Sequence, residues 1–183
     1  MPWPNLALVV EGSPQAATLS SPYPCSFVPK TQMRRRTRAR ELALQFLYQL
    51  DLRGDETLEA LQEFLDLECR DVETRSFAQR LITGTHQKQG EIDDVLIKVA
   101  RNWNLRRMAT VDRNVLRVAV YELLHCQDIP PKVTINEAIE IGKKFSTINS
   151  GGFINGILDR IHLDHLGETG ETEAVTEVVA EES

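Results

Sequence analysis

Residues 111–161 constrain the fold most, because two helix-breaking sequences divide them into three helical patterns. The first pattern, 111–124, carries apolar residues on one face and a second apolar strip beside it, so its helix must be covered on most sides. The pair Pro130-Pro131 ends this region, because proline lacks the amide donor and disfavours helical geometry in the residue before it. The sequence Ser150-Gly151-Gly152 marks the second break. The stretch therefore predicts three packed helices.

Local signals predict where these helices begin. Thr110 is expected to be the N-cap of the first helix, since its hydroxyl can accept a free backbone amide. The stretch Thr134-Ile135-Asn136-Glu137 matches a capping box and predicts a second helix after Thr134. The third helix is expected to follow Gly152.

Four helical patterns precede this stretch, at about residues 36–52, 57–67, 71–85 and 91–103, with Gly54 and Gly90 as breaks. No alternating strand pattern is long enough to predict a sheet. Short connections make successive helices antiparallel neighbours. The sequence therefore predicts an all-α fold of about seven helices in two packed bundles, residues 33–104 and 105–163.

Both ends of the chain differ in composition from this helical region. Residues 1–32 hold six of the eight prolines and predict a disordered extension. A second hypothesis is that Met33, directly before an arginine run, is the true start of the protein. Residues 164–183 hold seven acidic side chains and no lysine or arginine, which predicts a mobile acidic tail.

Basic charge is concentrated near the beginning of the helical region. Residues 33–163 hold 20 basic and 19 acidic side chains, although the whole chain has a formal charge of −6. Five arginines lie between residues 34 and 40, and arginine's planar donors suit phosphate oxygens and stack on bases. The run therefore predicts an RNA-binding helix entrance. The alternative is a solvated basic tail without a specific partner.

Other sequence signals exclude several classes of protein. Three widely spaced cysteines predict reduced thiols, and no apolar run reaches the length of a membrane span, so we expect a cytoplasmic protein. His162 and His165 lack a third ligand, and Gly142-Lys143-Lys144 lacks the rest of a phosphate loop. We expect no enzymatic activity, no metal site and no cofactor.

Three blocks of sequence, Asp112 to Leu123, Ile129 to Glu140 and Phe153 to Asp159, resemble the C-terminal half of the NusB family of bacterial transcription antitermination factors, in family order and at family spacing. Upstream, Arg34 to Glu41 followed by Ala43 to Tyr48 is similar to the family's arginine-rich start and first helix. The resemblance covers about residues 34–163. It implies the same two-bundle helical fold.

The resemblance also implies a function and a set of contacts. A protein of this family would bind boxA-type single-stranded RNA together with the ribosomal protein NusE, within an RNA polymerase antitermination complex, and so support ribosomal RNA transcription. The expected RNA-binding residues are Arg34, Arg35, Arg36, Arg38, Arg40, Tyr48, Asn149 and Phe153. The expected partner-binding residues are Asp112, Arg113 and Glu122.

Other readings of these residues stay open. Tyr48 could equally be a tyrosine at the edge of the core with its hydroxyl in water. The chain could be the detached NusB-like domain of an RNA cytosine methyltransferase. It could also be a protein-only scaffold that forms a homodimer and hides its RNA face.

Overall fold

The computed structural model describes residues 30–100 and 105–164. These residues form seven α-helices and two short 3-10 helices, with no strand among them, which confirms the predicted all-α fold. No described helix has the length and apolar character needed to cross a membrane. The elements are α1 (Lys30–Arg53), η1 (Asp55–Ala60), α2 (Leu61–Glu68), α3 (Val72–Gln87), α4 (Gln89–Val99), η2 (Leu105–Arg107), α5 (Thr110–His125), α6 (Pro131–Phe145) and a last helix at residues 150–164.

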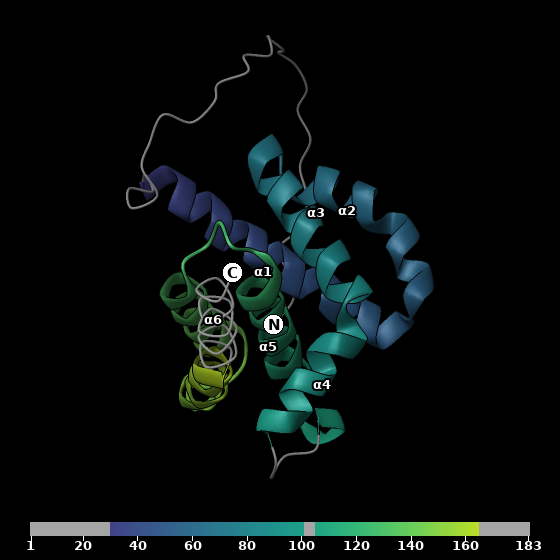
Figure 1. Cartoon of the computed structure of the whole chain (residues 1–183). Coiled ribbons are helices and arrows are strands. Elements are labelled where there is room, and N and C mark those ends of the chain that lie inside the picture. Colours follow the sequence, from purple (N-terminus) through teal and green to yellow (C-terminus); the bar gives the residue numbers. More distant parts are fainter. Residues whose placement is uncertain (1–29, 101–104, 165–183) are drawn as a thin grey trace, which may run out of the picture.

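The helices enclose two clusters of buried apolar side chains. The first cluster is formed by α1, α2 and α3, with Val118 of α5. The second is formed by α4, η2, α5, α6 and the last helix, with Leu44 of α1. Figure 1 shows α5 between α6 and α4, beside α1. The clusters agree with two packed bundles, but the side chains of α4 belong to the second one, whereas the sequence places residues 33–104 in the first bundle.

Helix α1 begins earlier than the sequence predicts. The sequence predicts disorder for residues 30–32, but they are already helical, because no proline or glycine separates them from the arginine run. The helix ends at Gly54 as predicted, where the φ angle of 88° favours glycine. The remainder of the predicted extension, residues 1–29, and the tail beyond residue 164 lie outside the described residues.

Four predicted helix boundaries in the rest of the chain are wrong. Ala109, not Thr110, is the N-cap of α5. Helix α6 begins at Pro131, because proline is preorganised for the first helical position, so Thr134 lies inside the helix and forms no capping box. Gly90 lies within the first turn of α4 and does not break it. The break before the last helix is at residues 146–149, and Ser150 is already helical.

Candidate nucleic-acid interface

The five arginines of the basic run all lie on the regular helix α1. Successive helical residues are rotated by about 100°, so five arginines within one and a half to two turns cannot face one surface. The structure separates them into an exposed Arg34, a pair that faces α3 (Arg35 and Arg36), Arg38 on another side, and a buried Arg40. The arginine run therefore does not form one continuous basic surface.

Arg35 and Arg36 border a groove between α1 and α3. Arg35 pairs with Asp71, which caps α3, at 3.3 Å. The guanidinium of Arg36 lies 5.2 Å from the ring centroid of Phe77 and 3.3 Å from a carboxylate oxygen of Asp128. The groove has a volume of about 430 Å³ and is lined by Gln32, Arg35, Arg36, Val72, Glu73, Ser76, Phe77, Arg80 and Asp128.

Arg80 is a basic residue of this groove that the sequence analysis missed. It pairs with Asp128 at 3.0 Å, so Asp128 lies between two guanidinium groups. Partial burial favours a higher pKa for Asp128, but the hydrogen bond from Arg80 and the charges of Arg80 and Arg36 lower it. Nothing in the sequence indicates that Arg80, on α3, faces the arginines of α1.

The ion pairs made by Arg35, Arg36 and Arg38 do not prevent binding of another anion. Each of these arginine side chains remains between about a quarter and two fifths exposed. Exposed ion pairs contribute about 0 to 1 kcal/mol, whereas an arginine can bind phosphate through two strong, charged hydrogen bonds. A polyanion can therefore displace these carboxylates.

Arg40 does not lie on this surface, so the structure gives no support to its predicted contact with RNA. Its side chain is 4% exposed, and its Nε and Nη2 atoms donate to the two carboxylate oxygens of Glu122, each at 2.7 Å. Burial alone would lower the pKa of Arg40, but the hydrogen bonds to Glu122 and the charge of Glu137 raise it. Glu122 is 0% exposed and also accepts a hydrogen bond from Thr134, so the structure offers no surface at which it could meet a partner.

Tyr48 lies at a second groove, whose volume is about 460 Å³. The tyrosine is 39% exposed, which is compatible with RNA binding. The groove is lined by Leu44, Gln45, Tyr48, Gln49, Phe64, Glu68, Val111 and Phe145. Arg38 reaches its edge, because it donates to Glu68 at 3.4 Å. This groove thus combines aromatic, amide and charged groups, and of its lining residues only Tyr48 was predicted.

The loop before the last helix is held in place by Asp112. Ser150 is buried, and its hydroxyl donates to a carboxylate oxygen of Asp112 at 3.1 Å. The preceding Asn149 is exposed, whereas Phe153 packs partly against the second cluster. Phe145, which ends α6 directly before this loop, lines the Tyr48 groove.

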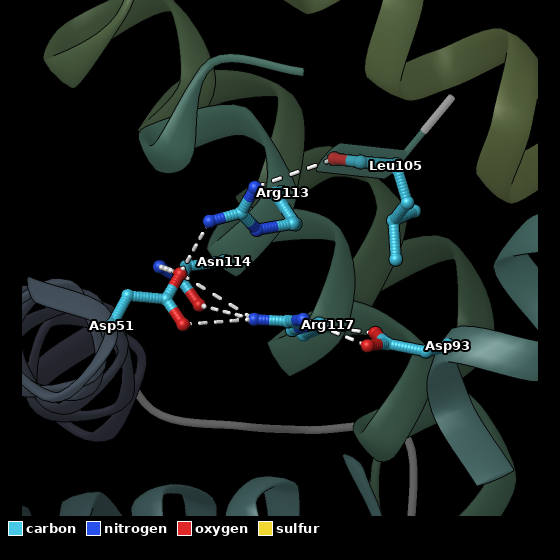
Figure 2. Close-up of polar contacts among 6 residues, drawn as sticks. All are labelled: Asp51, Asp93, Leu105, Arg113, Asn114 and Arg117. Atoms are coloured by element: carbon cyan, nitrogen blue, oxygen red, sulfur yellow. Dashed lines mark hydrogen bonds and ion pairs between the residues drawn. The ribbon is translucent and has the colours of Figure 1, made fainter. Parts of the chain in front are cut away.

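The partner-binding prediction involved Asp112 and Arg113 besides Glu122. One oxygen of Asp112 is bonded to Ser150 and the other is buried without a partner among the described residues, so both point into the protein. Arg113 joins a polar network, in which it donates to Asp51 at 2.9 Å and to the carbonyl of Leu105 at 3.3 Å (Figure 2). Both side chains therefore form their hydrogen bonds within the described structure, although Arg113 remains partly exposed to solvent.

Arg117 is the centre of the same network. It donates to Asp51 of α1 at 3.1 Å and to Asp93 of α4 at 2.7 Å, as Figure 2 shows. Burial favours a lower pKa for Arg117, but the two carboxylates raise it. Asn114 donates to Asp51 as well. The network fixes α1, α4 and α5 relative to one another.

Comparison with known proteins is consistent with this architecture. The sequence profile of the NusB family matches residues 37–163. The chain is 48% identical over 141 residues to the transcription antitermination protein NusB of Desulfatibacillum aliphaticivorans, an alignment that covers 77% of this chain and 98% of the relative. It is 49% identical over 128 residues to the NusB of Anaeromyxobacter dehalogenans strain 2CP-1, covering 69% of this chain and 89% of the relative. Both names refer to transcription antitermination and not to an enzymatic reaction.

Two solved structures share the fold. The NusB of T. maritima is 46% identical, with a TM-score of 0.64 over 69% of this chain and 89% of its own. A second structure, described as antitermination factors NusB and NusE in complex with dsRNA, is 28% identical, with a TM-score of 0.66 over 72% of this chain and 98% of its own. The region that the family profile matches contains the Tyr48 groove and the last two arginines of the run, Arg38 and Arg40. The chain belongs to the NusB family.

Proposed function

We propose that this protein is a transcription antitermination factor that binds single-stranded, boxA-type RNA together with NusE and supports transcription of ribosomal RNA as part of an RNA polymerase complex. One observation carries the proposal: a helix with exposed arginines adjoins the aromatic Tyr48 groove, in a chain of the NusB family. Arginines supply attraction to the RNA backbone, and aromatic and amide groups supply contacts to bases.

RNA and NusE enter the proposal through the solved complex of a relative that contains both. The RNA in that complex is double-stranded. The proposal for this chain specifies single-stranded RNA, because a groove lined by aromatic rings accommodates unstacked bases. Binding measured with single-stranded RNA and with the same sequence as a duplex separates the two forms.

The electrostatic part is tested by replacing Arg34, Arg35 and Arg36 together with alanine. We expect RNA affinity at about 0.1 M salt to fall at least about tenfold, and the salt dependence to become shallower by about two released cations, since each phosphate contact to a single strand contributes about 0.7 to the slope. Fluorescence anisotropy at several salt concentrations measures both quantities.

A matched control replaces three cations at another part of the surface, Arg53, Lys98 and Arg107, which changes the net charge by the same amount. The control should retain nearly the wild-type affinity and slope. An unchanged slope in the α1 variant, or equal losses in both variants, would contradict the proposed RNA surface.

The NusE part of the proposal is tested separately. Titration of labelled RNA with this protein, with and without purified NusE, should show tighter binding in the presence of NusE, because the partner enlarges the contact surface. Size-exclusion chromatography of the mixtures identifies the complex. If the protein forms a homodimer that RNA does not dissociate, and NusE does not bind, the proposal of a joint complex is wrong.

A further inference from the structure

The Tyr48 groove is formed where the two core clusters meet. Helix α1 provides Leu44, Gln45, Tyr48 and Gln49, and residues from both bundles complete the lining. Phe64 packs on the first cluster, and Phe145 packs on the second. The groove volume of about 460 Å³ lies within the range of about 300 to 1,000 Å³ typical of small-ligand pockets. It is therefore large enough for an aromatic ring that enters from solvent.

The aromatic side chains of the groove are held by the cores behind them. The ring of Phe64 lies 5.2 Å from that of Phe46, which is fully buried. The ring of Phe145 lies 4.9 Å below the ammonium group of Lys144. Tyr48 is more exposed than a core tyrosine and offers its ring to solvent. Such preorganised rings can stack on a base at little entropic cost.

Polar groups of the groove differ in what they can recognise. Gln45 and Gln49 each carry an amide donor and an acceptor, whereas the carboxylate of Glu68 only accepts hydrogen bonds. A carboxylate with two oxygens fits two adjacent N–H donors. Among the RNA bases, guanine presents such a pair on its Watson–Crick edge, from its ring N1 and its exocyclic N2.

Cations at the edge of the groove favour a nucleotide, whose phosphates are negatively charged, over a neutral aromatic ligand. Arg38 approaches Glu68 at 3.4 Å, and Lys144 lies over Phe145, so a cation adjoins the groove at two of its lining residues. Both side chains are at least 40% exposed. An aromatic pocket with cations at its rim suits a base whose 5′ and 3′ phosphates remain at the surface.

We infer that the Tyr48 groove is a pocket for one unpaired guanine, which stacks on Tyr48 and donates its N1–H and N2–H groups to Glu68, with Gln45 and Gln49 beside it and Arg38 and Lys144 at the flanking phosphates. This inference rests on the proposed function and specifies the base that the RNA surface selects.

The test uses single-stranded RNA oligomers of about ten uridines, within the usual site size for such proteins, in which the central nucleotide is guanosine, inosine or adenosine. Inosine retains the ring N1–H of guanosine and lacks the 2-amino group. The wild-type protein should bind the guanosine oligomer about tenfold more tightly than the inosine and adenosine oligomers. The Glu68→Gln variant should lose this preference and bind all three oligomers similarly.

Two further variants separate stacking from folding. Tyr48→Leu should lose about tenfold in affinity for the guanosine oligomer, and Tyr48→Phe should retain most of it, because a phenyl ring still stacks. Glu63→Gln, on the exposed side of the same helix as Glu68, is the matched control and should keep the wild-type preference. Circular dichroism confirms that each variant is folded.

The outcomes distinguish the pocket from the proposed function. If the wild type binds RNA but does not prefer guanosine to inosine, or if Glu68→Gln retains the preference, the guanine pocket is wrong while RNA binding stands. If the groove variants lower affinity for NusE and not for RNA, the groove is a protein contact and the inference is overturned. If the wild type binds none of these oligomers and no boxA-type RNA, the proposed function itself is wrong.

Discussion

At the scale of single residues, the arginine run shows how one sequence motif can contain two different roles. The charge of the run predicts that its arginines are exposed to solvent. Four of them are at least partly exposed: Arg34, Arg35, Arg36 and Arg38. Arg40 instead forms a buried ion pair with Glu122, 82 residues farther along the chain. The motif's spacing could have indicated this difference, because Arg40 follows Ala39 and lies a turn before Ala43 on the buried side of the helix.

Arg40 is therefore expected to contribute to stability and not to direct RNA contact. Arg40→Met leaves the Glu122 carboxylate buried without its charged partner, so the free energy of unfolding should fall by about 3 to 5 kcal/mol. Arg34→Met, in the same run but exposed, should change it by less than about 0.5 kcal/mol. Urea denaturation followed by circular dichroism measures both. A double variant with Glu122→Leu should recover part of the loss, and its failure to do so would contradict the ion-pair explanation.

Cys126 is a second residue whose environment predicts its chemistry. Its side chain is buried, and burial raises the pKa of the thiol to about 11, with the nearby carboxylates acting in the same direction. At pH 8 only about one such thiol in a thousand is ionised, so iodoacetamide should modify Cys126 in the native protein far more slowly than the half-buried Cys69. Peptide mapping after timed alkylation measures each rate. In urea the two cysteines should be alkylated at equal rates. Equal alkylation rates in the native protein as well would contradict the prediction.

At the scale of helices, the apolar periodicity predicted which elements exist better than where they begin. The apolar residues that recur with the helical period on α1, from Ala39 to Leu50, are buried. Helix ends depend on competing local signals, and Pro131 determined the start of α6 in place of Thr134. The hydroxyl of Thr134 binds Glu122 instead, a contact between helices that no local pattern could indicate.

The grooves between helices could not be predicted from the sequence. Tyr48 could be chosen as a candidate RNA-binding residue, since it follows the arginines by two to three turns on the same helix. Phe64 and Phe145 reach the same groove from different helices, and their periodicity marks them only as residues that face inward. Their shared position depends on how α2 and α6 pack around α1, which is a property of the tertiary structure.

The network of Asp51, Asp93 and Arg117 predicts how the junction of α1, α4 and α5 depends on pH (Figure 2). Partial burial acts to raise the pKa of Asp51, but the hydrogen bonds and charges of Arg113 and Arg117 lower it below its ordinary value of 3.8. Below about pH 4, therefore, the unfolded chain binds more protons at this residue than the folded chain. The stability that Asp51 contributes is complete above that pH and is lost as the pH falls through its folded-state pKa.

Asp51→Asn should remove this contribution. We expect the free energy of unfolding at pH 7 to fall by about 1 to 2 kcal/mol, because Arg117 keeps Asp93 as a partner. The difference between wild type and variant should shrink as the pH is lowered from 4.5 toward 3 in steps of about 0.5, measured by urea denaturation at each pH. A difference that grows on acidification would contradict the assigned direction of the pKa shift.

At the scale of the whole molecule, the two bundles should unfold as one unit. Helix α1 is packed mainly on the first core cluster but contributes Leu44 to the second, and Val118 of α5 enters the first. Phe46→Ala, which removes a fully buried ring from the first cluster, should cost about 3 to 5 kcal/mol. Hydrogen exchange should then accelerate in both α3 and α6, because global unfolding exposes them together. Acceleration restricted to the first bundle would show two independent units.

The position of α1 has a consequence for ligand binding. Its inner side closes both cores, while its exposed sides carry Tyr48 and the exposed arginines. A ligand that needs the intact Tyr48 groove binds the folded protein and not the unfolded chain, because the groove residues from α1, α2, α5 and α6 separate when the protein unfolds. By mass action, saturation with such a ligand at a hundred times its dissociation constant adds about 2.7 kcal/mol to the folded state. A ligand bound at α1 should thus raise the melting temperature of the last helix, residues 150–164, which lies about a hundred residues farther along the chain.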